Sequence, residues 1–104
     1  MAIDAIYPSL KDKTVLITGG GSGIGEALTR AFIAQSAKVG FLDYDKAASE
    51  TLAAELDSPD LHFEYCDLRD IDALQAAVKA VSTKLGPIRI LVNNAARDDR
   101  HSLE

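Results

Sequence analysis

Short apolar runs alternate along this chain with longer segments in which apolar residues recur every three or four positions. The runs occupy residues 14–17, 38–42, 61–66 and 88–92. Runs of this length and composition are typical of strands that are buried on both faces. The intervening segments have the spacing of helices with one apolar face. Because strands alternate with helical segments of about 10 to 15 residues, the chain is predicted to form parallel strands joined by crossover helices.

The order of these elements also predicts the order of the strands in the sheet. Crossover connections are right-handed, and a glycine-rich turn follows the first strand, so the sheet order 3-2-1-4 is favoured. We therefore expect a doubly wound parallel sheet of the α/β class, with the chain order β-α-β-α-β-α-β. Residues 1–104 contain no repeat, low-complexity stretch or linker, which indicates a single domain.

Two of the predicted helices have well-defined apolar faces. In the first helix, the residues expected on the buried face are Ile24, Leu28, Ala31 and Phe32. The third helix is expected to begin at the N-cap Asp70 and to end at Gly86 and Pro87. Its apolar face is predicted to carry Ile71, Leu74, Val78, Val81 and Leu85.

The composition narrows the classes of partner and the cell compartment. A formal net charge of -5 disfavours nucleic acids and anionic membranes as partners, because both attract a basic face. No apolar run approaches the roughly 20 residues of a membrane span, and residues 1–10 lack the pattern of a secretory signal. Cys66 is the single cysteine, so no internal disulfide can form. These features predict a cytoplasmic protein with no nucleic-acid and no membrane partner.

The sequence Thr-Gly-Gly-Gly-Ser-Gly-Ile-Gly at residues 18–25 joins the first strand to the first helix. Glycines there permit a tight turn and a close approach of backbone to a pyrophosphate, which the free N–H groups and dipole of the helix start also favour. One alternative is a glycine-rich loop without a ligand. A Walker-type loop is excluded because the turn has no lysine. The predicted dinucleotide contacts are Gly19, Gly21, Ser22, Gly23, Ile24 and Gly25.

Asp43 ends the second predicted strand, at about the separation from the glycine turn expected of an acidic residue that binds the adenosine ribose. A carboxylate at this point accepts hydrogen bonds from the ribose hydroxyls and repels a 2′-phosphate. Tyr44 is neutral, Asp45 adds negative charge, and Lys46 is the one basic residue nearby. We therefore predict NAD in preference to NADP, with Asp43 and Tyr44 in the site. The alternative is a solvated aspartate in an ordinary loop.

The sequence motif of the glycine turn resembles that of the short-chain dehydrogenase/reductase family, whose fold is a Rossmann-type sheet. Two further motifs are similar to those of the family: Asp67-Leu68 after the third strand, and Asn93-Asn94-Ala95-Ala96 after the fourth. The resemblance implies that the Asp67 side chain and the Leu68 N–H hold the adenine. It also implies that Asn93 steadies the sheet, with Asn94 beside it, and that Ala95 lies against the adenosine. Ala96 departs from the usual glycine.

Residues 5–11, the triple glycine and residues 98–101 also resemble bacterial aldose 1-dehydrogenases of the D-xylose type within this family. The resemblance runs along the whole chain but covers less than half of a typical member. It implies a small-molecule substrate, an alcohol or an aldose, whose oxidation passes hydride to NAD. It further implies that the full-length protein is a homodimer or a homotetramer.

The family's catalytic Tyr-x-x-x-Lys and its serine have no counterpart here. Tyr44 and Tyr65 lack a lysine four residues later, and Tyr7 with Lys11 precedes the first strand and spans Pro8. We therefore expect no catalytic residue in this chain, which we interpret as the incomplete, cofactor-binding N-terminal portion of a longer enzyme. The rival hypothesis is a non-catalytic module that binds or senses NAD. No metal site is predicted, because His62 has no partners at ligand spacing.

Overall fold

The computed structural model describes residues 8–21 and 23–94. In chain order its elements are η1 (Pro8–Leu10), β1 (Thr14–Thr18), α1 (Gly23–Ala34), β2 (Lys38–Asp43), α2 (Lys46–Leu56), β3 (Leu61–Tyr65), α3 (Ile71–Leu85) and β4 (Ile88–Asn93). The four strands are parallel and form one sheet in the order β3-β2-β1-β4. Both the predicted class of fold and the predicted strand order are confirmed.

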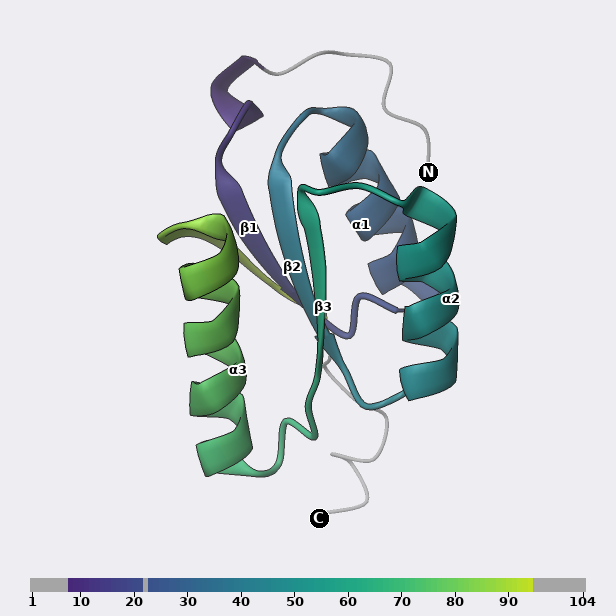
Figure 1. Cartoon of the computed structure of the whole chain (residues 1–104), viewed down its shortest axis with the longest axis vertical. Coiled ribbons are helices and arrows are strands. Elements are labelled where there is room, and N and C mark those ends of the chain that lie inside the picture. Colours follow the sequence, from purple (N-terminus) through teal and green to yellow (C-terminus); the bar gives the residue numbers. More distant parts are fainter. Residues whose placement is uncertain (1–7, 22, 95–104) are drawn as a thin grey trace.

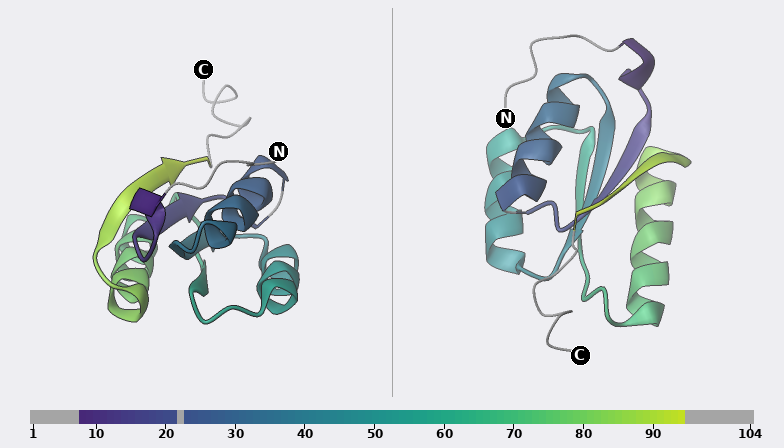
Figure 2. Two further views of the ribbon diagram at one scale, coloured as in Figure 1. Left: turned by 90° about the horizontal axis from the view of Figure 1, so that it is seen from above. Right: turned by 180° about the vertical axis from the view of Figure 1, so that it is seen from behind.

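The molecule has three layers, with α1 and α2 on one face of the sheet and α3 on the other (Figures 1 and 2). Every strand runs from the upper to the lower end of the sheet in Figure 1, and every strand-to-helix connection lies at the lower end. The carboxyl ends of parallel strands therefore meet at one edge. That edge is where open α/β sheets bind their ligands.

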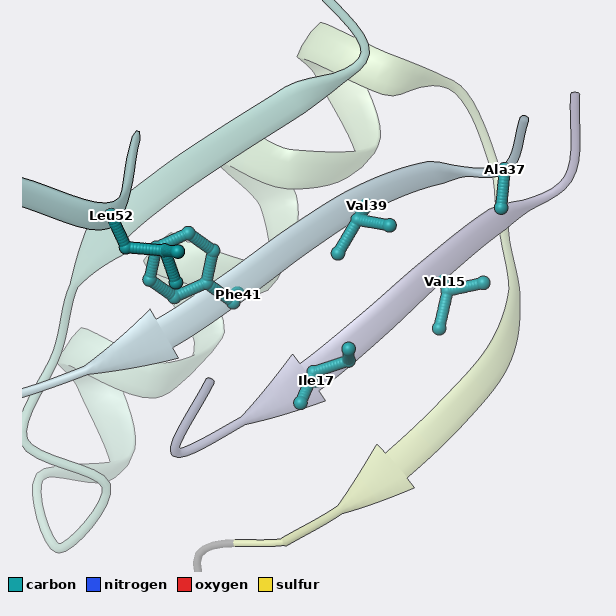
Figure 3. Close-up of a cluster of buried hydrophobic side chains, with 6 residues drawn as sticks. All are labelled: Val15, Ile17, Ala37, Val39, Phe41 and Leu52. Atoms are coloured by element: carbon teal, nitrogen blue, oxygen red, sulfur yellow. The ribbon is translucent and has the colours of Figure 1, made fainter. Parts of the chain in front are cut away.

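The face that packs against α1 and α2 is built from the alternate residues of β1 and β2. Six side chains form its buried centre (Figure 3): Val15, Ile17, Ala37, Val39, Phe41 and Leu52. The ring of Phe41 stacks on that of Phe63, with centroids 5.1 Å apart. The packing of this apolar layer fixes the position of β1 and β2 relative to the two helices.

The opposite face packs against α3. Its buried centre comprises Leu16, Leu42, Cys66, Ala77, Val81 and Leu85. Gly40 of β2 lies directly beneath Val81, and a side chain on Gly40 would occupy the space of that valine. The Thr14 hydroxyl donates to the Leu85 carbonyl at 2.9 Å and so caps the end of α3.

Two aspartates start helices where the sheet ends. Asp45 accepts from the Ala48 N–H at 3.1 Å and caps α2, while Asp70 accepts from the Ala73 N–H at 3.1 Å and caps α3. The predicted N-cap Asp70 is thus confirmed.

The assignment of Ile24 and Ile71 to buried helix faces is wrong. Ile24 is 70% exposed and Ile71 is 61% exposed. Both lie in the first turn of a helix, at the edge where the strands end, so their side chains extend past the apolar layer instead of packing on it. Leu28 and Phe32, one and two turns further along α1, do pack against the core.

Candidate functional site

The described residues that the sequence singled out gather at the carboxyl edge of the sheet. The glycine turn leaves β1, and Asp43 and Tyr44 stand at the end of β2. Asp67 and Leu68 follow β3, and Asn93 and Asn94 close β4. Ser22 and Ala95, which were predicted with them, lie outside the described residues, as do residues 98–101.

The glycine turn has a backbone that only glycine adopts without strain. Gly19 and Gly23 have φ angles of 71° and 60°. Gly25 packs so closely on the Gly19 carbonyl that a side chain there would overlap it. By contrast, among the described residues outside the backbone of this first helical turn, no atom lies within 4 Å of the position that a Gly23 side chain would take. The turn is therefore tight against the sheet and open at the start of α1.

The start of α1 presents N–H groups without partners in their own helix, and the positive end of its dipole. Glu26, in the first turn, would oppose an anion there. Its carboxylate is bound by Arg30, whose Nε and terminal nitrogen lie 3.0 Å and 2.8 Å from Oε2. Arg30 also pairs with Glu55 of α2 at 2.8 Å. Because Arg30 offsets its charge, Glu26 leaves the helix start compatible with a phosphate.

Asp43 is a buried carboxylate that is held by two backbone amides. Its Oδ2 accepts from the Gly21 N–H at 2.9 Å, and its Oδ1 accepts from the Asp45 N–H at 2.9 Å. The side chain is 7% exposed. The second strand is thereby tied to the glycine turn, and the carboxylate has a defined orientation beside it.

The end of β4 is also tied to the turn. The Thr18 hydroxyl donates to Asn93 Oδ1 at 2.9 Å, across the pair of residues that face each other in the β1–β4 ladder. The Asn94 side-chain amide donates to the Gly19 carbonyl at 3.1 Å. Both asparagines therefore restrain the end of β1, from which the turn departs.

The segment after β3 presents a carboxylate that already has a partner. Asp67 accepts from the backbone N–H of Arg69 at 3.0 Å and from its guanidinium at 2.9 Å and 3.0 Å. Leu68 packs its side chain against the core beneath α3. Just before them, Cys66 is 1% exposed, and burial raises the pKa of its thiol, with further increases from the charges of Asp67, Asp70 and Glu64.

Two residues beside the turn escaped the sequence analysis. Thr29 of α1 is fully buried, and its hydroxyl lies 3.1 Å from the Gly20 carbonyl. Ser49 of α2 is fully buried, and its hydroxyl lies in the space that a side chain on Gly21 would fill. The signal that was available for Thr29 is its position: one turn after Gly25, it places a hydroxyl on the buried side of the helix.

Among residues 8–21 and 23–94, no group of three or more His, Cys, Asp or Glu side chains is arranged to hold a metal ion. Within the same residues, no helix is long and apolar enough to cross a membrane.

Comparison with known proteins identifies the family. The family model described as short chain dehydrogenase matches residues 13–104. The chain belongs to the short-chain dehydrogenase family. The resemblance of its glycine turn and of its two later motifs is thus confirmed at the level of the family.

Two curated relatives of this short-chain dehydrogenase chain are sugar dehydrogenases by name. A probable galactose dehydrogenase of Rhizobium meliloti is 49% identical over 102 residues, which cover 94% of this chain and 40% of the relative. A D-xylose 1-dehydrogenase of Caulobacter vibrioides is 50% identical over 101 residues, which cover 95% of this chain and 39% of the relative. The chain therefore spans about two fifths of the length of these relatives.

Solved structures of the family have the same fold. A 3-ketoacyl-(acyl-carrier-protein) reductase of Brucella melitensis, complexed with NADH, is 38% identical, with a TM-score of 0.75 over 79% of this chain and 34% of its own. A short-chain dehydrogenase/reductase of the same organism, named as a glucose/ribitol dehydrogenase, is 26% identical, with a TM-score of 0.78 over 84% of this chain and 37% of its own.

Proposed function

We propose that this chain is the cofactor-binding part of an NAD-dependent short-chain dehydrogenase that oxidises an alcohol or a sugar hemiacetal. The observation that carries the proposal is the bond between the Gly21 N–H and the Asp43 carboxylate, at 2.9 Å. It holds an acidic side chain beside a glycine turn that opens a helix. This is the arrangement that a dinucleotide needs for its ribose and its pyrophosphate.

The described residues fit such a cofactor. The space over Gly23 would admit the pyrophosphate to the N–H groups at the start of α1. Ile24 at the start of α1 and Tyr44 after β2, which are 70% and 69% exposed, would offer apolar surface at the same edge of the sheet. Asp67 has its guanidinium partner in place, so adenine would share that carboxylate, which has four lone-pair positions. When bound, the nicotinamide supplies the acceptor for a hydride.

The preference for NAD over NADP rests on the charge of Asp43. Its two oxygens are oriented by backbone amides of the turn and of the β2–α2 connection. Each oxygen retains lone pairs that can accept from a ribose hydroxyl. A 2′-phosphate would bring a second negative charge against this buried carboxylate, and Lys46 is the one nearby cation to offset it.

The proposal for the substrate rests on the sugar dehydrogenases named above, which are 49% and 50% identical to this chain. In such an oxidation the carbon bearing the hydroxyl gives up a hydride to the nicotinamide, and the hydroxyl gives up a proton. An aldose in its ring form would yield a lactone. We assign the proton transfer to no residue of this chain.

The test uses the protein expressed from its complete gene. Calorimetry with NAD and NADP should give the tighter dissociation constant for NAD. An Asp43→Asn variant should weaken NAD binding and narrow the preference, whereas Asp12→Asn, an exposed aspartate that precedes β1, should match the wild type. If Asp43→Asn has the same dissociation constants for NAD and for NADP as the wild type, the proposed role of Asp43 is refuted.

Turnover separates the enzyme from a binding module. A panel of aldoses and polyols, assayed with NAD by the appearance of NADH, should include at least one substrate whose rate saturates. NAD binding without turnover on any member of the panel would favour a non-catalytic NAD-binding module.

A further inference from the structure

Thr29 bonds to the glycine turn from inside the first helix. It is fully buried in the middle of α1, and its Oγ1 lies 2.9 Å from the Gly25 carbonyl and 3.1 Å from the Gly20 carbonyl. The first contact is the common one, in which a helical threonine bonds back to the residue four positions earlier. The second contact reaches outside the helix, to the tip of the turn. A single hydroxyl proton serves both acceptors.

The Gly20 carbonyl and the Gly21 N–H belong to one planar peptide group. Thr29 contacts the carbonyl end of that group at 3.1 Å, and the Asp43 carboxylate accepts from its N–H end at 2.9 Å. A rotation of this peptide that frees one end moves the other end as well. The two side chains, one from α1 and one from the end of β2, therefore depend on each other through one rigid group.

Besides these two hydrogen bonds, the described neighbours of the peptide are Phe41 beside Gly20 and Ser49 beside Gly21. A side chain on Gly20 would come within 2.9 Å of the Thr29 hydroxyl and within 3.0 Å of the Phe41 ring, so residue 20 lies between α1 and β2. Apolar contact with Phe41 limits its position but does not select the direction of its carbonyl. Two hydrogen bonds supply that direction, from the Thr29 hydroxyl at the carbonyl end and to the Asp43 carboxylate at the N–H end.

We infer that Thr29 is a positioning residue for the ribose-binding carboxylate: it orients the Gly20–Gly21 peptide, which in turn orients Asp43. The inference rests on the proposed binding of NAD. Thr29 is fully buried and its hydroxyl donates to the Gly20 and Gly25 carbonyls, so its effect on cofactor affinity and on the preference for NAD would pass through Asp43. A threonine with a purely structural role would affect folding and leave that preference unchanged.

The experiment compares three variants of the protein expressed from its complete gene. Thr29→Val keeps the shape of the side chain and removes the hydroxyl, whereas Thr29→Ser keeps the hydroxyl. Thr51→Val is the matched control, because the Thr51 hydroxyl makes the same back-bond, to the Ala47 carbonyl at 2.9 Å, on the exposed surface of α2. Dissociation constants for NAD and NADP, KM for NAD and kcat at saturating NAD are measured for each.

Thr29→Val should raise the dissociation constant and the KM for NAD about fivefold to tenfold, the loss expected for one net hydrogen bond. Its binding of NADP should change less, so the preference narrows, and kcat at saturating NAD should stay within about twofold of the wild type. Thr29→Ser should regain most of the NAD affinity, and Thr51→Val should match the wild type. Equal NAD constants for Thr29→Val and Thr29→Ser would overturn the inference.

A double-mutant cycle tests the route through Asp43. In an Asp43→Asn background, Thr29→Val should raise the dissociation constant for NAD less than about twofold, because the carboxylate that Thr29 orients is gone. If the effects of Thr29→Val and Asp43→Asn on the free energy of NAD binding are fully additive, the inference is overturned, while the proposal that the protein binds NAD still stands. A wild-type protein that binds no NAD would overturn the proposed function, and the inference with it. Should Thr29→Val fail to fold, Thr29→Ala against Thr29→Ser repeats the comparison.

Discussion

The Ser49 hydroxyl lies in the space that a side chain on Gly21 would fill. Ser49 is fully buried, and its Oγ has no hydrogen-bond partner in the part of the chain that the structure describes. Asp43 Oδ2 lies 2.9 Å from the position that the β-carbon of a side chain on Gly21 would take. A side chain on Gly21 would therefore meet both α2 and the acceptor of the Gly21 N–H.

Gly21→Ala should weaken NAD binding, because the new methyl group displaces either Ser49 or Asp43. Ser49→Ala removes the nearest atom, so the loss caused by Gly21→Ala should be smaller in that background. Calorimetry of the two single variants and the double variant measures the coupling. Equal losses in both backgrounds would contradict the contact.

Ser49→Ala by itself should leave the free energy of unfolding unchanged or raise it by up to about 1 kcal/mol, since it removes a buried hydroxyl that no group satisfies. Urea titration checks this. A loss of more than about 1 kcal/mol would show that the hydroxyl has a partner.

Asn94→Ala should lower the free energy of unfolding by about 1 kcal/mol, because it removes the side-chain amide that donates to the Gly19 carbonyl at 3.1 Å. It should also raise the dissociation constant for NAD, because the start of the turn loses its restraint. Gln75→Ala, at an exposed position of α3, is the control for losing an amide. Indistinguishable urea midpoints for the two variants would count against the role of Asn94.

Glu55 gives the stability a dependence on pH in the acid range. The hydrogen bond from Arg30, and then its charge, hold the pKa of this carboxyl below its ordinary value. A lowered pKa in the folded state means that the contribution is present above the unfolded pKa and is lost as the pH falls through the folded value. Glu55→Gln should therefore flatten the fall in Tm between neutral and acid pH.

The effect of Glu55→Gln should be small and should shrink in high salt, because the pair is at the surface. Glu50→Gln, an exposed glutamate of the same helix, serves as the control. Parallel Tm profiles for the two variants would argue that the Arg30–Glu55 pair contributes nothing.

Cys66 should react slowly with iodoacetamide in the folded protein. The thiol is 1% exposed, and burial with neighbouring carboxylates raises its pKa, so little thiolate is available at neutral pH. Mass spectrometry of the peptide that contains Cys66 should show rapid alkylation in urea and little without it. Fast labelling in native buffer would show that the end of β3 opens readily.

The fold was predictable because parallel strands covered on both faces appear in the sequence as unbroken apolar runs. Residues 14–17 and 38–42 have that pattern, and they form the two central strands. The helix periodicity was misleading at Ile24 and Ile71, where the period continues into a first turn that lies beyond the sheet. Periodicity indicates which way a side chain faces, whereas burial also requires a strand or helix against which that side chain can pack.

The placement of the predicted residues was predictable where spacing along the chain determines it: Gly19 and Asp43 both lie where strands end at one edge of the sheet, and their binding of a cofactor stays a prediction. Thr29 and Ser49 were not found. Thr29 could have been identified from its position one turn after Gly25, whereas a single hydroxyl such as that of Ser49 has no periodic signal. Their importance arises from contact with Gly20 and Gly21, and that contact exists only once two helices pack on the sheet.

The shared peptide between Thr29 and Asp43 has a consequence for cofactor engineering. A library that randomises only the acidic position would remove one of two restraints on the Gly20–Gly21 peptide, and its members would differ in loop geometry as well as in charge. Reversal of the proposed preference for NAD would therefore call for joint selection at positions 29, 43 and 49. A first-round variant with poor affinity for both nucleotides would then indicate a displaced glycine turn. Such a variant would be a suitable starting point for a second round of selection.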